Sequence, residues 1–153
     1  MEISSDFKEL LLAFNEEGVK YLVIGALAVG FHGFPRATID FDVLVEPSTE
    51  NARLVYRALT TFGAQLHELT EQDLTSDDLV FMMGVVPHRI DILTSISGVD
   101  FGVAWEHRVA GQVAGVPANF IGFDELIANK LAAGRDKDLV DVRRLRLARE
   151  GKE

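Results

Sequence analysis

The chain has 153 residues, of which 48% are hydrophobic and 25% are charged, a balance typical of one soluble globular domain with a buried core. Its formal net charge of −9 argues against broad, non-specific binding to nucleic acid. The chain has no cysteine, which excludes disulfides and thiolate metal sites, and its apolar runs are far too short to span a membrane. The first residues do not resemble a secretory signal, so we expect a cytoplasmic protein without a membrane partner.

The charge is distributed unevenly along the chain. From residue 130 to the last residue, eight Lys and Arg stand against five Asp and Glu, whereas the preceding part carries seven basic and nineteen acidic residues. The basic segment is either a solvated helix face or a contact surface for phosphates or an RNA end.

Hydrophobic periodicity, together with the positions of Gly and Pro, predicts alternating helices and strands. Helices are expected at about 5–17, 27–31, 49–62, 100–109, 123–133 and 136–149. Strands are expected at about 19–24, 39–45, 65–69, 79–86 and 89–96, with a further strand or hairpin within 112–121. This order indicates a single α/β (α+β) domain over 1–153, in which a small mixed β-sheet is flanked by helices. Its core covers about 19–121, and the C-terminal helices cover about 123–149.

Two acidic residues interrupt the strand predicted at 39–45. Because side chains alternate along a strand, Asp40 and Asp42 point to the same face, while Phe41 and Val43 point to the other. Carboxylates about 7 Å apart along one strand repel each other unless a positive charge lies between them. A hard divalent cation is the natural candidate for that charge.

A third carboxylate, Asp91, lies within the strand-like segment HRIDILTSI, on the same face as Arg89. Burying a lone carboxylate is costly, so we expect Asp91 to face a cleft, a cation or a basic partner. From the pattern alone, the three acids Asp40, Asp42 and Asp91 form either a metal site or a set of unrelated solvent-facing carboxylates.

Lys130 is the opposite anomaly, a cation on an apolar helix stripe. It lies seven residues after Phe123, on the face that the helix at 123–133 buries. Its ammonium group either reaches solvent at the edge of the stripe or meets an anion, which would be a phosphate or a catalytic acid.

Three motifs in this order resemble a known superfamily. They are a Gly-Ala pair followed after eleven residues by TIDFDV, then RIDILT, then DELIANKLAAGRDKDLVDV. Together they resemble the minimal nucleotidyltransferases, whose catalytic core is similar to that of DNA polymerase β. The branch that they resemble most is that of the AbiEii-type toxin nucleotidyltransferases and their short bacterial relatives. The resemblance runs from about residue 21 to residue 145.

The resemblance implies a reaction and a set of roles. Gly25 and Ala26 would open a helix whose backbone N–H groups cradle a nucleoside triphosphate (NTP). Asp40, Asp42 and Asp91 would be catalytic and would bind metal, with two Mg²⁺ ions, and Asp91 would assist the attacking hydroxyl. The products would be a nucleotidylated acceptor and pyrophosphate.

The same resemblance assigns basic residues to the triphosphate. Lys130 would approach it, with Arg135 or Lys137, and Asp138 would hold Lys130 or an arginine in place. Further implied phosphate contacts are Arg36 and Thr38, in the loop before the acidic strand.

For the whole protein, the resemblance implies the toxin component of a bacterial toxin–antitoxin or phage-defence pair. Its acceptor would be tRNA or a protein side chain, and a cognate antitoxin would be its partner. Ala26 departs from the usual Ser or Gly and removes a hydroxyl that could bind phosphate. The alternative is therefore a catalytically silent module that binds a nucleotide or a partner on the same fold.

Overall fold

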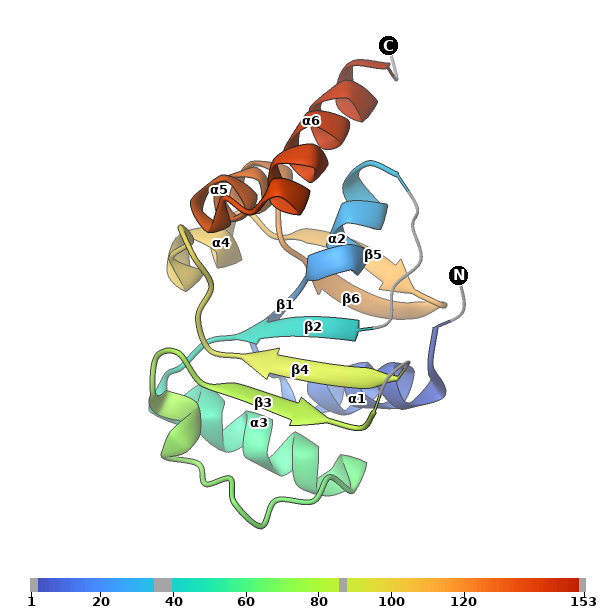
Figure 1. Cartoon of the computed structure of the whole chain (residues 1–153). Coiled ribbons are helices and arrows are strands. Elements are labelled where there is room, and N and C mark those ends of the chain that lie inside the picture. Colours follow the sequence, from blue (N-terminus) through green and yellow to red (C-terminus); the bar gives the residue numbers. More distant parts are fainter. Residues whose placement is uncertain (1–2, 35–39, 86–87, 152–153) are drawn as a thin grey trace.

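The structure is a computed structural model that describes residues 3–34, 40–85 and 88–151 (Figure 1). Its helices are α1 Ser5–Glu17, α2 Gly25–His32, α3 Thr49–Phe62, α4 Phe101–Glu106, α5 Phe123–Ala133 and α6 Asp136–Gly151, with a short 3-10 turn η1 at Asp73–Thr75. Its strands are β1 Tyr21–Ile24, β2 Asp40–Val45, β3 Val80–Met83, β4 Arg89–Leu93, β5 Val109–Val113 and β6 Val116–Phe120. None of the described helices is long and apolar enough to cross a membrane.

The strands form one mixed sheet in the order β3-β4-β2-β1-β6-β5. The pair β2 and β4 runs parallel, as does the pair β1 and β6, whereas β1 and β2 run antiparallel. Two antiparallel hairpins, β3–β4 and β5–β6, close the two edges. The predicted fold class, a small mixed sheet flanked by helices, is confirmed.

Helices cover both faces of the sheet, and each face has its own apolar core. The larger core joins α1 and α3 to one face through buried side chains such as Phe7, Leu59 and Phe41. The smaller core joins α2, α5 and α6 to the other face through side chains such as Ala28, Leu126 and Leu145. Figure 1 shows α5 and α6 at one end of the molecule and α3 at the opposite end.

Strand β2 has the alternation that the sequence predicts. Phe41, Val43 and Val45 are at most 1% exposed and belong to the larger core. Asp40 and Asp42 therefore lie on the opposite face, toward the helices of the smaller core, and both are partly exposed. The two acids share a face that the helices do not fully cover.

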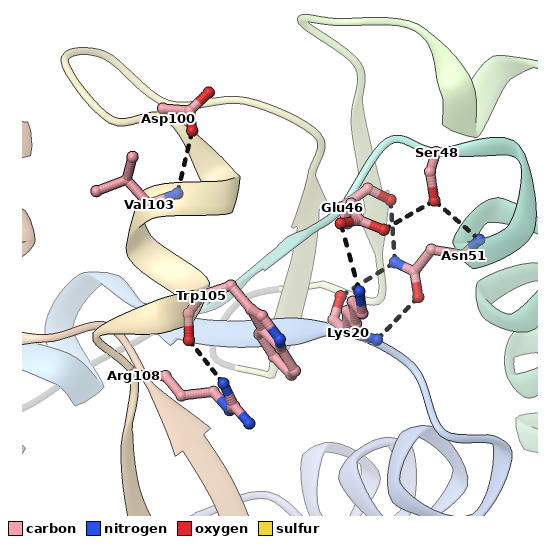
Figure 2. A network of polar contacts seen from close by, with 8 residues as sticks. All are labelled: Lys20, Glu46, Ser48, Asn51, Asp100, Val103, Trp105 and Arg108. Carbon is pink, nitrogen blue, oxygen red and sulfur yellow. Dashed lines mark hydrogen bonds and ion pairs between the residues drawn. The ribbon is translucent and has the colours of Figure 1, made fainter.

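The end of β2 is fixed by the side chain of Asn51, which is 3% exposed. Its Oδ1 accepts a hydrogen bond from the backbone N–H of Lys20 (2.8 Å), and its Nδ2 donates to the carbonyls of Lys20 (3.1 Å) and Glu46 (2.9 Å). Figure 2 shows this network, in which Ser48 also donates to the Glu46 carboxylate (2.8 Å). The beginning of β1, the end of β2 and the start of α3 are thereby joined.

Helix α4 is short and is held by polar contacts at both ends (Figure 2). The Asp100 carboxylate accepts a hydrogen bond from the backbone N–H of Val103 (3.1 Å), which caps the first turn. At the other end, the Arg108 guanidinium lies 3.9 Å from the centroid of the Trp105 ring and donates to the Trp105 carbonyl (2.7 Å). These contacts set α4 beside the beginning of β1, where Lys20 also faces Trp105.

The strand predicted at 65–69 is wrong, because the structure has turns and irregular backbone there. Leu66 and Leu69 pack against the larger core without joining the sheet. The edge beside β4 is occupied by β3, which pairs antiparallel with it. The apolar alternation in this segment therefore reflects a loop packed on the core.

The segment predicted as a strand or hairpin at 112–121 is a hairpin that begins earlier, at Val109. Its turn contains Ala114 and Gly115, with φ values of +48° and +87°. Two successive positive φ values are typical of the tight turns that match the twist of paired strands. Because β5 begins at Val109, α4 ends at Glu106, before the predicted end of that helix.

Candidate functional site

A cleft of about 1300 Å³ opens over the sheet face that carries Asp40 and Asp42. It begins at the junction of β1 with α2, follows β2, and is bounded by the segment between β4 and α4 and by the junction of α5 with α6. Its described lining includes Gly25, Ala26, Asp40, Asp42, Lys130, Arg135, Lys137 and Asp138. Eight residues predicted for the site from distant parts of the chain thus line one cleft.

Asp91 lies beside this group. In the parallel pairing of β2 with β4, Asp42 stands opposite Asp91, and Asp40 stands opposite Arg89. Neighbouring strands are about 4.8 Å apart, so the carboxylates of Asp42 and Asp91 lie close together on one face. Asp91 is 8% exposed, which makes it the most buried of the three acids.

Arg89 supplies a positive charge to two of these carboxylates. Its Nη2 donates to Oδ2 of Asp40 (3.0 Å) and to Oδ2 of Asp91 (3.1 Å), and its Nε donates to Oδ1 of Asp91 (3.1 Å). The Arg89 side chain is 34% exposed, whereas that of Asp91 is 12% exposed. The guanidinium is therefore the more exposed member of this pair.

Asp42 carries the electrostatic cost of this arrangement. Burial, followed by the negative charges of Asp91 and Asp40, raises the pKa of Asp42 from 3.8 to about 6. Arg89 lowers this pKa, but its effect is smaller than theirs. The site thus holds more negative charge than Arg89 compensates.

The close approach of Gly25 to Asp42 explains why a glycine stands where β1 turns into α2. Gly25 has a φ of +69°, a region that residues with a Cβ rarely adopt, and an added Cβ would collide with the Asp42 carboxylate. The first turn of α2 therefore begins directly against this acid. Backbone N–H groups at the start of a helix have no partner within it, which suits them to phosphate oxygens.

Lys130 is buried, with an exposed fraction of 8%, and it meets two anions of the protein itself. Its Nζ lies 3.0 Å from Oδ2 of Asp141 and 3.6 Å from Oδ1 of Asp138. The sequence left two environments open for the Lys130 ammonium, solvent or an anion. In the structure it contacts two carboxylates. Because Lys130 also lines the cleft, its charge contributes to the cleft's potential.

Asp138 is fully buried and binds two cations. The Arg135 Nε donates to its Oδ2 (2.7 Å) and the Arg135 Nη2 donates to its Oδ1 (3.2 Å), while Lys130 lies on the other side. The fork from Arg135 and the charge of Lys130 outweigh burial and lower the pKa of Asp138. Asp138 therefore stays ionised and fixes both basic residues at the junction of α5 with α6.

The remaining predicted site residues lie at the edge of the cleft or outside the described part of the chain. Lys137 is exposed on the first turn of α6, at the rim of the cleft. Ala26 lies in the first turn of α2. Arg36 and Thr38 lie outside the described residues.

Two residues of this site received no role from the sequence. Arg89 was placed on the same strand face as Asp91, and the i, i+2 spacing is the signal that links them. Asp141 follows Asp138 by three residues, so it lies on the same side of α6. Arg89 also contacts Asp40 on β2, and Asp141 contacts Lys130 on α5, and sequence spacing does not encode these contacts between elements.

The donor chemistry of Asp40, Asp42 and Asp91 fits Mg²⁺, because carboxylate oxygens are the ligands that hard divalent cations prefer. The raised pKa of Asp42 points the same way, since a cation at this position would relieve the repulsion. Within the described part of the chain, however, no three acidic or histidine side chains already converge on a point that a metal ion could occupy. Arg89 binds two of the three acids instead.

The fold is similar to that of a solved protein from Thermotoga maritima, whose crystal structure is described as that of a "putative nucleotidyltransferase". The two chains superpose with a TM-score of 0.61 and 14% identity, over 93% of this chain and 93% of that one. No protein-family model matches the sequence, and no curated protein matches it. The expected nucleotidyltransferase fold is confirmed, while the AbiEii-type branch remains a prediction.

Proposed function

We propose that the protein is a Mg²⁺-dependent nucleotidyltransferase that moves an NMP from an NTP to a hydroxyl of a macromolecule. The observation that carries the proposal is the placement of Asp42 opposite Asp91 on parallel neighbours, with Asp40 on the same face of β2. These acids lie in or beside a cleft that also contains the start of α2 and the buried Lys130. Acids on one wall and phosphate-binding groups on another form the combination that phosphoryl transfer requires.

Each group of residues would have one task. The backbone N–H groups at the start of α2 would bind phosphate oxygens, with Gly25 allowing the chain to pass close to Asp42. Lys130, held by Asp138 and Asp141, would face the triphosphate together with Arg135. Asp40, Asp42 and Asp91 would hold two Mg²⁺ ions, which neutralise phosphate charge when bound.

The reaction balances without a further reagent. The acceptor oxygen forms a bond to the α-phosphorus of the NTP, and the bond from that phosphorus to the bridging oxygen breaks. Pyrophosphate leaves, and the proton of the acceptor hydroxyl passes to a carboxylate, for which Asp91 is the candidate. The products are a nucleotidylated acceptor, pyrophosphate and the released proton.

The charge of the cleft favours a protein side chain over tRNA as the acceptor. Among its described lining residues, seven are acidic and three are basic: Asp40, Asp42, Glu46, Asp77, Asp78, Asp100 and Asp138 against Lys130, Arg135 and Lys137. The polyphosphate backbone of RNA would be repelled along most of this surface. We further propose, from the resemblance, that the protein is the toxin component of a bacterial toxin–antitoxin or phage-defence pair, with a cognate antitoxin as its partner.

The second candidate is a catalytically silent module that binds a nucleotide or a partner. The observation that favours it is the set of hydrogen bonds from Arg89 to Asp40 and Asp91, since a guanidinium can replace a metal ion as their permanent counter-charge. Ala26, which lacks a hydroxyl for phosphate, points in the same direction.

The test is a transfer assay. The protein is incubated with Mg²⁺, each α-labelled NTP in turn, and either total tRNA or candidate acceptor proteins, beside the Asp40→Asn/Asp42→Asn variant. We expect label on a protein acceptor, and we expect the double substitution to abolish it. A matched Asp77→Asn variant, which changes an exposed acid on the same cleft, should retain transfer.

Two other outcomes would contradict the proposal. Tight binding of Mg·NTP without transfer to any acceptor would favour the silent module. If the protein bound neither Mg²⁺ nor any NTP in equilibrium dialysis, the assignment of Asp40, Asp42 and Asp91 as metal ligands would be wrong. Transfer of label to tRNA alone would support the nucleotidyltransferase activity but contradict the choice of a protein acceptor.

A further inference from the structure

Arg89 lies where a cation of the proposed reaction has to bind. Its guanidinium donates three hydrogen bonds to the carboxylates of Asp40 and Asp91, all of 3.0 or 3.1 Å. These two acids belong to the set that the proposed function assigns to Mg²⁺. A bidentate pair such as the one between Arg89 and Asp91 is among the strongest hydrogen-bonded contacts that a carboxylate makes.

The position of Arg89 allows it to leave without disturbing the core. Its side chain is 34% exposed, and its residue lies on the sheet face that carries the acids. The backbone of Arg89 is paired opposite Asp40 in the sheet. Only the Arg89 side chain therefore has to turn away from the two acids. The neighbouring Ile90 and Ile92 point into the larger core and stay in place when Arg89 moves.

The third acid differs from the other two. The hydrogen bonds of Arg89 reach Asp40 and Asp91, whereas Asp42 receives the guanidinium's charge only at longer range. A divalent cation that approached Asp42 would have to compete with Arg89 for the oxygens of the flanking acids. One carboxylate is a weak site for Mg²⁺, which dehydrates reluctantly.

We propose that Arg89 is a resident counter-cation that keeps free Mg²⁺ out of the site and moves to a phosphate oxygen when the metal arrives together with a triphosphate. This inference rests on the proposed function. A displaced guanidinium needs a new anion, and the triphosphate supplies one whose geometry matches the guanidinium fork. Metal and nucleotide binding are then positively coupled through Arg89, which acts as a positioning residue for the three acids.

The coupling is reciprocal. If a triphosphate raises the affinity of the site for the metal, the metal raises the affinity for the triphosphate by the same factor. Without Arg89 its hydrogen bonds to Asp40 and Asp91 are lost, so the free metal binds more tightly and the part of the coupling that depends on Arg89 disappears. Competition by Arg89 therefore predicts that its loss strengthens one binding step and weakens the link between the two.

The experiment measures Mn²⁺ binding by electron paramagnetic resonance, with Mn²⁺ in place of Mg²⁺ and inorganic tripolyphosphate as a probe that has no base. Wild type, Arg89→Met and Arg89→Lys are compared, each with and without tripolyphosphate. Arg57→Met is the matched control, because Arg57 pairs with Glu17 at 3.5 Å on α1, away from the cleft lining. Circular dichroism checks that each variant is folded.

We expect Arg89→Met to bind free Mn²⁺ about tenfold more tightly than wild type, within the usual range of coupling between two sites. Tripolyphosphate should tighten Mn²⁺ binding to wild type and to Arg57→Met, and should tighten it less in Arg89→Met, which keeps only the direct contact between metal and phosphate. Arg89→Lys keeps the charge but loses the fork, so its free Mn²⁺ affinity should lie between those of wild type and Arg89→Met.

The inference is overturned if folded Arg89→Met binds free Mn²⁺ no more tightly than wild type, or if tripolyphosphate still tightens Mn²⁺ binding to this variant as much as in wild type. In either case the proposed transfer reaction can still stand, since the wild type would bind metal and nucleotide without a role for Arg89. A different result marks failure of the proposed function itself: no Mn²⁺ binding by wild type or any variant, even with tripolyphosphate present.

Discussion

Asp42 and Asp91 stand opposite each other in the parallel pairing of β2 with β4, two like charges on one face of a sheet. Burial and this neighbour raise the pKa of Asp42 to about 6. A protein that only had to fold would gain from an uncharged residue here. The pair therefore places two mutually repelling carboxylates on one face of the sheet, at a cost to stability.

This relationship predicts that Asp42→Asn stabilises the protein at neutral pH. Because the pKa of Asp42 is raised from 3.8 to about 6 in the folded state, the folded protein binds this proton more tightly than the unfolded chain. The stability that depends on this proton is fully present below pH 3.8 and is lost as the pH rises through 6. At pH 7.5, we expect Asp42→Asn to gain about 2 kcal/mol in the free energy of unfolding, and the gain should shrink toward pH 4.

Urea denaturation of both proteins between pH 4 and pH 8 checks this prediction. Asp77→Asn serves as the control, since Asp77 is an exposed acid of the same cleft and its replacement should change stability by less than about 0.5 kcal/mol. A gain for Asp42→Asn that does not vary with pH would contradict the account, because it would have a cause other than the charge of Asp42.

A second prediction concerns the buried pair of Lys130 and Asp141, whose charged atoms lie 3.0 Å apart. Asp141 is 3% exposed, so Asp141→Asn leaves the Lys130 ammonium with Asp138, at 3.6 Å, as its one carboxylate partner among the described residues. Loss of one partner of a buried pair costs about 3 kcal/mol, whereas replacement of both by apolar residues is often close to neutral. We expect Asp141→Asn to be clearly destabilised and Lys130→Met/Asp141→Leu to recover most of the loss.

Thermal unfolding of Lys130→Met, Asp141→Leu and the double variant forms a cycle that isolates the pair. The exposed pair of Lys20 and Glu46, 3.8 Å apart, is the matched control, and Lys20→Met should cost less than about 1 kcal/mol. Purely additive effects of the two substitutions at Lys130 and Asp141 would show that the contact does not position Lys130.

Much of the fold could be predicted because local signals agree with the final arrangement. Strand β2 was predicted correctly because its alternation of apolar and acidic residues places Phe41 and Val43 in the core. Helix ends at Gly18 and Gly63, which have φ values of +74° and +94°, were visible as glycines after apolar stripes. The prediction of a strand at 65–69 was wrong because an apolar loop and a half-buried strand have the same sequence pattern. The two can be distinguished only in the fold, where β3 already occupies that edge of the sheet.

The acids of the candidate site could be singled out from the sequence, and the resemblance linked Asp138 to Lys130 or an arginine, but the other partners could not be predicted. Asp40, Asp42 and Asp91 are conspicuous because carboxylates interrupt apolar strands. The ion pairs of Arg89 with Asp40 and of Asp141 with Lys130 depend on which strands and helices become neighbours. Contacts between elements produce no periodic pattern in the sequence, so these ion pairs can be identified only from the fold.

A third prediction follows from the charge of the cleft. Its acidic lining at Asp77, Asp78 and Asp100 should repel RNA, so we expect no binding of total tRNA at about 0.15 M salt in fluorescence anisotropy. Asp77→Lys/Asp78→Lys should bind tRNA measurably, and more strongly as the salt concentration falls. Tight binding of tRNA to wild type at this salt concentration would contradict the preference for a protein acceptor.

A fourth prediction tests the contact between Gly25 and Asp42. Gly25→Ala introduces a Cβ where φ is +69° and where the Asp42 carboxylate already lies, so it should cost conformational energy and also displace the acid. Gly18→Ala is the matched control, because Gly18 has a φ of +74° and no atom lies within 4 Å of its added Cβ. The control should lose only the cost of the left-handed conformation, about 1 kcal/mol.

The two alanine variants are compared by urea denaturation and by Mn²⁺ binding in the presence of tripolyphosphate. Gly25→Ala should be destabilised by about 1–3 kcal/mol more than Gly18→Ala, since the collision adds to the backbone cost. It should also lose metal binding, whereas Gly18→Ala should keep it. Equal destabilisation of the two variants, with metal binding intact in both, would show that Asp42 yields freely and that its position against the first turn of α2 does not matter for the site.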